Sequence, residues 1–286
     1  MTTGQVYWGR TGYVEIEGAG RTYGNESGAN TLDFKFDITK YGSMYSEFNV
    51  SILGLNSETI NQLTVWKPQD AESERRQVKV FAGYEVDGKP NLLASGGVWS
   101  ALPTPPPEMW LNMSCLHSLN KKVPVENPGN FTGSLRELFN IVAKEMGYES
   151  KIWNVRGDVP AGKQKFRIDG LKADLAQKFA QKFNLIVYDD DGTLTAIDQK
   201  GERLPPKNPI DVNINTGLLS MGNVSVGGAT VRVRLTNRFK LYSWVNLKST
   251  LIPKASGLYY VIKTRYVGHM RGDEWYTELE MLRGVK

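Results

Sequence analysis

Four carboxylates near the end of the chain are the residues best suited to acid–base chemistry. The segment GDEWYTELE (272–280) carries Asp273, Glu274, Glu278 and Glu280 beside a Trp-Tyr pair. Glycoside hydrolases use two carboxylates roughly 5–9.5 Å apart, a spacing that Glu278 and Glu280 can reach. A catalytic acid also needs a desolvated pocket that raises its pKa, whereas this face would carry lysine and arginine. The segment therefore favours a structural interpretation over a catalytic one.

The other side chains able to bind a metal or attack a substrate do not form a recognisable site. Cys115 and His117 would share a strand face, but a zinc site needs four ligands. The acidic run 189–192 lacks the spacing of an EF-hand loop and fits a hairpin turn, and RGD (271–273) is short enough to occur by chance. The sequence lacks a phosphate-binding glycine loop, a Gly-x-Ser-x-Gly motif and a His/Glu metal motif. We therefore predict a non-enzymatic protein with no catalytic residue, metal or cofactor.

Alternation along a β-strand explains the carboxylates as one half of a hairpin. In residues 274–281 the glutamates fall on one face, and Trp275, Thr277 and Leu279 fall on the other. The preceding segment, 257–268, divides in the same way into an aromatic face and a basic face. One antiparallel register with GHMRGD as the loop satisfies both faces. That register pairs Tyr266 with Trp275, Ile262 with Leu279, and Lys263 with Glu278.

Strand and helix patterns divide the chain into three parts. Residues 1–120 consist of short strands rich in β-branched and aromatic residues, with one short helix capped by Ser57. Residues 121–205 contain two amphipathic helices, each followed by a short apolar strand, which indicates a weak internal repeat. Residues 206–286 return to strands. The predicted fold is mainly β with an α+β insert, in which two β-barrel domains flank a small α/β module of paired helix-strand units.

The composition is that of a folded protein. Of the 286 residues, 40% are hydrophobic, which is enough to build packed cores. No run of about 18 apolar residues is present to span a membrane, and the amino terminus lacks a signal-peptide pattern. The single cysteine excludes an intramolecular disulfide and suits folding in a reducing cytoplasm.

A long basic stretch in the last third of the chain suggests an acidic partner. The net charge is only +5, but no acidic residue lies between Asp211 and Asp273. Such a one-sided segment predicts contact with nucleic acid or with an acidic surface of a neighbouring protein, and a solvated basic face is the alternative. The candidate interface residues are Arg232, Arg234, Arg238 and Lys240.

Several segments share the order and spacing of the final barrel strands in a known family. They are TGLLS (216–220), the Gly-Gly-x-x-Val-Arg-Val-Arg-Leu-x-Asn run (227–237), GLYYVIKTRYVG (257–268) and GDEWYTELE (272–280). VKVFAGYE (78–85) with SGGV (95–98) is similar to the first barrel of the same family. On these segments the chain resembles the baseplate hub (tail hub) proteins of contractile-tailed bacteriophages and related phage-tail-like particles.

The resemblance implies a structural virion protein at the axis of a tail baseplate. In this family each chain of a homotrimer supplies two barrels like those of the tail-tube subunit, so three chains make a pseudo-hexameric ring. Such a ring joins the six-fold tail tube to the three-fold spike (the cell-puncturing protein), contacts other baseplate proteins and passes DNA as cargo, without membrane insertion. The resemblance also implies assembly in the host cytoplasm. The alternatives are a distal tail protein of a non-contractile phage and a tail-associated cell-wall hydrolase.

Overall fold

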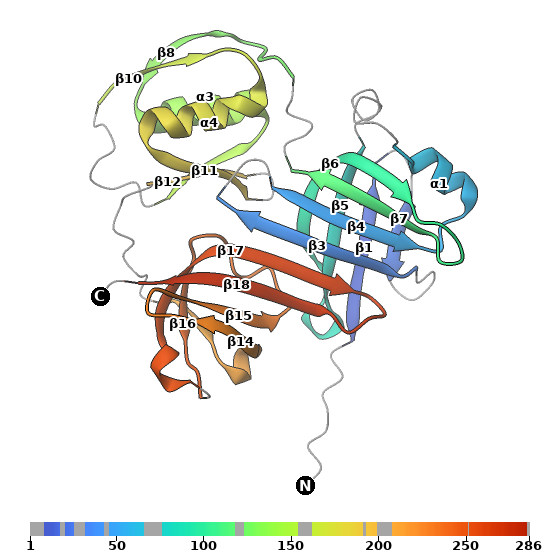
Figure 1. The fold of residues 1–286 in the computed structure, drawn as a ribbon. Coiled ribbons are helices and arrows are strands. Elements are labelled where there is room, and N and C mark those ends of the chain that lie inside the picture. Colours follow the sequence, from blue (N-terminus) through green and yellow to red (C-terminus); the bar gives the residue numbers. More distant parts are fainter. Residues whose placement is uncertain are drawn as a thin grey trace.

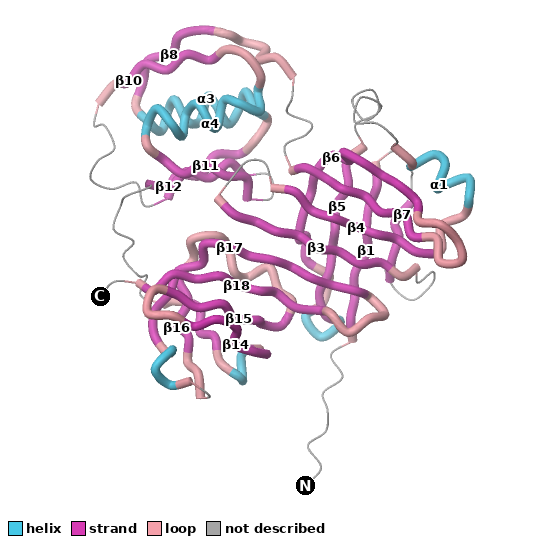
Figure 2. The backbone as a smooth tube through the Cα atoms, in the orientation of Figure 1, coloured by secondary structure: helices cyan, strands magenta, loops and turns pink. Residues whose placement is uncertain are grey.

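The computed structural model describes most of the chain as strands (Figure 1, Figure 2). The described residues form one long, mostly antiparallel sheet and a separate lobe that contains two α-helices and two small sheets. None of the described helices is long and apolar enough to cross a membrane. The described stretches are 9–17, 21–25, 32–42, 46–65, 76–117, 123–153, 162–190, 193–198, 208–250 and 252–284.

The strands that precede the lobe are called the first strand group. In β3, inward apolar residues alternate with outward polar ones, as the buried Phe34 and Phe36 show. Helix α1 (Ser57–Leu63) is capped by the side chain of Asn56, and the predicted cap Ser57 is its first helical residue. The strands of this group are β1 (Arg10–Ile16), β2 (Arg21–Asn25), β3 (Phe34–Tyr41), β4 (Glu47–Leu53), β5 (Gln77–Tyr84), β6 (Asn91–Pro103) and β7 (Trp110–Leu116).

The strands that follow the lobe are called the second strand group. All of its strand pairs are antiparallel except β13 with β16, which is parallel. Among the described residues, three short 3-10 helices connect strands in the two groups: η1 (Glu85–Asp87), η3 (Ile214–Thr216) and η4 (Pro253–Ala255). The strands of this group are β13 (Ile210–Val212), β14 (Leu218–Val224), β15 (Gly228–Arg234), β16 (Trp244–Leu247), β17 (Gly257–His269) and β18 (Trp275–Arg283).

The two strand groups belong to one sheet, because β17 pairs with strands of both. Residues 257–260 of β17 pair with β16, and residues 263–269 pair with β3. This pairing of β17 with β3 is called the joint, and Figure 1 shows the two strands side by side. The described strand pairs trace an open path from β14 to β2 and close no barrel. The predicted domain boundaries after residues 120 and 205 fall outside the described residues.

The two groups repeat one strand order. In the first group the order is β3-β4-β7-β6-β5, and in the second it is β14-β15-β18-β17-β16. In both groups the strand that comes fifth along the chain (β7 or β18) lies in the sheet between the second (β4 or β15) and the fourth (β6 or β17). Strands β6 and β17 occupy the same place, have 13 residues each, and each shifts register against its hairpin partner. The chain therefore contains the same five-strand arrangement twice.

The lobe is built from two strand–helix–strand units. Helices α3 (Leu135–Met146) and α4 (Lys172–Phe183) both have 12 residues and end in a left-handed residue, at Gly147 and Asn184. Ser134 caps α3 in a capping box with Glu137, which lowers the pKa of Glu137 through hydrogen bonds from Ser134. The strands are β8 (Gly129–Gly133), β9 (Glu149–Trp153), β10 (Gln164–Ile168), β11 (Leu185–Asp190) and β12 (Thr193–Asp198).

Both helices of the lobe pack between its sheets (Figure 1). Strands β8 and β10 pair on one side, and β11, β12 and β9 form the sheet on the other. The lobe core contains four phenylalanines linked by ring contacts, in which Phe179 touches Phe139, Phe166 and Phe183. This core is distinct from those of the strand groups, so the lobe supplies its own apolar burial.

The core of the first strand group continues into the second. Leu235, Tyr266 and Trp275 come from the second group but are buried among the apolar residues of the first. The indole Nε1 of Trp275 donates to the Gly83 carbonyl at 3.2 Å, and the Tyr84 hydroxyl donates to the Trp275 carbonyl at 3.3 Å. Apolar burial and hydrogen bonds therefore both hold the tip of the β17–β18 hairpin against the first group.

Candidate functional surface

The β17–β18 hairpin is present, but its register differs from the prediction. Gly268 lies opposite Trp275, and Tyr266 lies opposite Thr277. The predicted pairs of Tyr266 with Trp275, Ile262 with Leu279, and Lys263 with Glu278 are therefore wrong by two residues at this end. A slip of two residues keeps every side chain on its face, so alternation alone excludes only odd slips. The turn decides the register, because the His269 amide donates to the Glu274 carbonyl at 2.8 Å and shortens the loop.

A bulge in β17 also changes which residues face the core. The register shifts between Val261 and Lys263, so Ile262 has no single partner. Before the bulge Val261 is buried, whereas after it Thr264 and Tyr266 are buried. Strict alternation through residues 257–268, as predicted from the sequence, puts Val261 on the basic face with Lys263 and Arg265. That placement is wrong because the extra residue reverses the alternation.

The outward face of the shared sheet carries a row of alternating charges across four strands. Arg232 on β15 binds Glu278 on β18, with Nε and Oε2 2.9 Å apart. Arg265 on β17 lies opposite Glu278 and donates to Asp37 on β3, with Nε and Oδ1 2.8 Å apart. These hydrogen bonds raise the pKa of Arg232 and of Arg265. These four residues are called the polar row, and the row crosses the joint.

The carboxylates first considered for catalysis lie on this outward face. Glu278 is held by Arg232, and Glu280 is exposed. Both border an open groove of about 350 Å³ whose lining also includes Lys263 and Arg265. A glycosidase acid requires a desolvated pocket that keeps it protonated, which this basic groove does not provide. The geometry supports a structural role for the segment.

Three of the four candidate interface residues bind acidic side chains of the same chain. Arg232 binds Glu278 in the polar row. Arg234 makes two hydrogen bonds of 2.9 and 2.8 Å to the carboxylate of Asp87, across the two strand groups. Lys240 binds Asp190 of the lobe at 3.0 Å.

The acid-free stretch is therefore balanced by carboxylates that are distant in sequence. Lys248 binds Asp211, which lies just outside the stretch, and Arg265 binds Asp37. Arg238 is exposed and forms no ion pair with the described residues. A role of the candidate interface residues in contacts with another molecule stays a prediction.

A second cluster fixes the tip of the hairpin to the first strand group. Arg10 on β1 donates to the carbonyls of His269 and Gly272. The His269 Nε2 lies 3.0 Å from Asp33 Oδ2, and the other oxygen of Asp33 accepts from the Arg271 amide at 3.2 Å. Together these contacts hold residues 269–272 between β1 and the start of β3.

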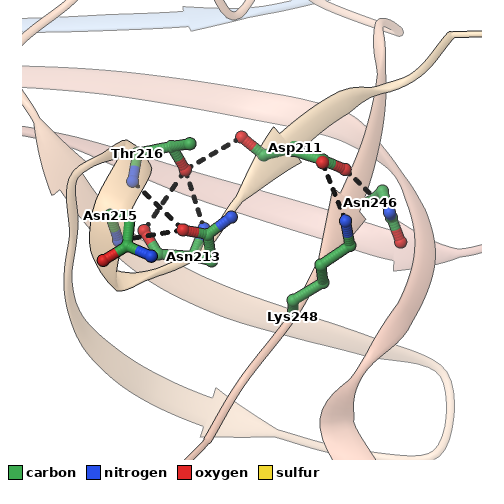
Figure 3. Close-up of polar contacts among 6 residues, drawn as sticks. All are labelled: Asp211, Asn213, Asn215, Thr216, Asn246 and Lys248. Carbon is green, nitrogen blue, oxygen red and sulfur yellow. Dashed lines mark hydrogen bonds and ion pairs between the residues drawn. The ribbon is translucent and has the colours of Figure 1, made fainter.

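A polar cluster fixes the entry to the second strand group (Figure 3). Asn213 Oδ1 accepts from the backbone amides of Asn215 and Thr216, and the Thr216 hydroxyl donates to the Asp211 carbonyl at 3.0 Å. The Asp211 carboxylate accepts from Lys248 at 2.8 Å and from the Asn246 amide at 2.7 Å, which lowers the pKa of Asp211. The cluster therefore sets the direction in which the chain enters β14.

Sequence reasoning missed the partners of the basic residues and the Arg10 cluster. Asp37, Asp87, Asp190 and Arg10 lie far from the basic stretch in sequence. Each reaches its partner because the fold places the first strand group or the lobe against the second group. The alternation of β3 signals that Asp37 faces outward, but it does not indicate the strand beside it.

Comparison with solved structures shows a fold used by phage tail proteins. The 43 kDa tail protein of prophage MuSo2 from Shewanella oneidensis aligns with a TM-score of 0.61 at 11% identity, over 96% of this chain and 98% of that one. A tail protein from Neisseria meningitidis MC58 aligns with a TM-score of 0.58 at 12% identity, over 96% and 97%. The E. coli c3393 protein, a type VI secretion system component, aligns with a TM-score of 0.53 at 8% identity, over 96% and 77%.

The family comparison covers nearly the whole chain. No curated protein matches the sequence. The family model described as "Baseplate hub gp41" matches residues 19–281. A baseplate hub is a structural component of the phage tail and part of the virion, which agrees with the predicted resemblance. The chain belongs to the baseplate hub gp41 family of phage tail structural proteins.

Proposed function

We propose that this chain forms a homotrimeric ring at the axis of a tail baseplate, where it joins the six-fold tail tube to a three-fold spike. The single observation that carries the proposal is the repeated strand order within one sheet. A trimer of chains that each present two similar units has six similar units around its axis, which matches six subunits on one side and three on the other. The two strand groups are the tube-like domains in this proposal, and the lobe is the insert between them.

The joint supports the idea that the two units act as one body. Seven residue pairs link β17 to β3, from Lys263 with Tyr41 to His269 with Lys35. Trp275 adds a buried anchor, and Arg234 adds a two-hydrogen-bond contact to Asp87. A symmetry adaptor needs such rigidity, because the angle between its two units must stay constant around the ring.

The polar row supports a lumen that passes DNA without holding it. In this proposal the outward face of β15, β18, β17 and β3 lines the passage. Arg232 and Arg265 on that face are each bound to a carboxylate of the chain. A DNA phosphate would have to displace Glu278 or Asp37 to bind them, so the affinity for the backbone is kept low. Arg238, which is exposed, is the candidate residue for contact with the tube or spike protein.

Electron microscopy of the purified chain tests the proposal. Averaged top views should show a ring with six similar densities around a central hole, and processing without imposed symmetry should reveal the lobe at only three of them. Rings with six lobes would indicate a hexamer and would contradict the proposal. A linear or two-fold assembly would contradict it as well.

A further inference from the structure

The repeated strand order shows that an edge strand is paired within the chain in the first strand group but not in the second. In the first strand group β3 is the end strand of the five, and its outer edge pairs with β17 in the joint. The strand in the same position of the second group is β14. Its inner edge pairs with β15, and no described strand pairs with its outer edge. Figure 1 shows β14 as the outermost strand of its group.

Strand β14 and the turn after it also expose apolar side chains. Leu219 is 60% exposed, Val224 is 36% exposed, and Val226 in the turn is 91% exposed. An open strand edge with exposed apolar residues is a template for association with another chain, and soluble proteins usually block it with charge or proline. Residues 218–227 carry no charged residue and no proline.

We propose that the outer edge of β14, with the turn 225–227, docks against the first strand group of a second copy of this chain. The proposal rests on the trimeric ring proposed above and names the surface through which its copies meet. Edge β3 is filled within the chain, so the equivalent edge β14 is the one left to repeat that contact between copies. The occupant is therefore another copy, in which β14 takes the position that β3 has within the chain, without the long backbone ladder of the joint.

Within the chain, β3 pairs with the carboxyl-terminal part of β17. Strand β6 corresponds to β17 in the repeat, so in this proposal β14 meets the carboxyl end of β6 in the neighbouring copy. There Ala101 already exchanges backbone hydrogen bonds with Val65, and β6 ends at Pro103, which has no N–H to donate. A long backbone ladder like the joint is therefore blocked. The contact between copies is made mainly by side chains, with Leu102, which is 40% exposed, facing Leu219 and Val226.

Lysine substitutions on the proposed edge test the inference. Leu219→Lys and Val226→Lys should each raise the concentration at which trimers form at least tenfold, measured by light scattering over a dilution series. Val86→Lys is the matched control, because Val86 is 57% exposed in η1, which precedes the amino end of β6, and should leave the trimer unchanged. Circular dichroism melting checks that each variant is folded. Val226 lies in an exposed turn, so its variant has little packing to lose.

Cross-linking between two variants that each carry one added cysteine tests the partner surface directly. Leu219→Cys and Leu102→Cys, mixed and treated with a short bis-maleimide, should give a covalent dimer, whereas Val86→Cys mixed with Leu102→Cys should not. The native Cys115 is buried, and burial raises its pKa, so it does not compete. A wild-type trimer that persists in both lysine variants and gives no cross-link overturns the β14 inference alone. A wild type that is monomeric throughout overturns the proposed function and the inference with it.

Discussion

Arg265 on β17 donates two hydrogen bonds to Asp37 on β3, although the two residues are 228 positions apart in the sequence. The pair lies on the outward face of the joint, where the two strand groups become one sheet. Trp275 lies on the inward face of the same joint. The joint is thus fixed from both sides, by charge on one and by apolar burial on the other.

A double-mutant cycle measures the outer contact of the joint. Arg265→Met, Asp37→Ala and the double variant should give a coupling of about 0.5–1 kcal/mol in urea unfolding, because the pair is doubly hydrogen-bonded but partly exposed. The matched control is the Arg167–Asp169 pair of the lobe, whose side chains are 73% and 41% exposed, and which should show no measurable coupling. Equal coupling in the two pairs would contradict the special role of Arg265.

Truncation of Trp275 removes the inner anchor. Trp275→Ala should destabilise the chain by about 3–5 kcal/mol, because a buried ring and its hydrogen bond to Gly83 are lost together. Tyr276→Ala, on the outward face of the same strand, is the control and should cost far less. Equilibrium urea unfolding measures both variants. Equal losses would show that the hairpin tip is not anchored in the first strand group.

Gly268 tests how closely the joint is packed. A Cβ at this position would lie 2.3 Å from Phe36 Cζ and 2.9 Å from Trp275 Cε3, so Gly268→Ala should destabilise the chain by about 1–3 kcal/mol. Gly227→Ala adds the same methyl where no atom lies within 4 Å and should be nearly neutral. A neutral Gly268→Ala in thermal unfolding would mean that β3 and the hairpin are less closely packed than described.

The pH dependence of Asp211 tests the cluster that leads into β14. Lys248 and Asn246 lower its pKa, so its contribution to stability is present above the usual aspartate pKa of about 3.9 and is lost as pH falls through the lower folded value. Lys248→Met should move the pKa of Asp211 back toward the usual value, as followed by carboxyl carbon NMR. Lys254→Met, outside the cluster, should leave it unchanged. An unshifted Asp211 in Lys248→Met would contradict the ion pair.

The hydrolase alternative makes a direct prediction about Glu278. Because Glu278 is bound to Arg232 on an open face, neither the wild type nor Glu278→Gln should clear peptidoglycan in a zymogram. An active muramidase on the same gel controls for the substrate. Clearing by the wild type and loss of clearing in the variant would require a catalytic role for this residue.

The sequence predicts the local elements of this fold better than their long-range partners. The two faces of β18 and the capping box at Ser134 follow from side-chain alternation and cap spacing, and the structure has both. The predicted register of the β17–β18 hairpin is wrong by two residues because a shift by an even number of residues leaves every side chain on the same face of the sheet. The bulge at Ile262 leaves no signal in the composition of the strand.

The candidate interface was the part least accessible from sequence. Local sequence shows that Arg232, Arg234 and Lys240 lie in an acid-free stretch, but their carboxylate partners come from other parts of the chain. Which strands become neighbours is decided by packing over the whole chain. The pairing of β17 with β3, and with it the balance of charge on the outward face, therefore appears only in the folded structure.

The mass of the wild-type chain in solution tests the central claim most directly. Size-exclusion chromatography with multi-angle light scattering should give three times the chain mass of 32.0 kDa, because two units per chain around a six-position ring require three chains. A stable monomer, or a hexamer of six chains, would contradict the hub ring.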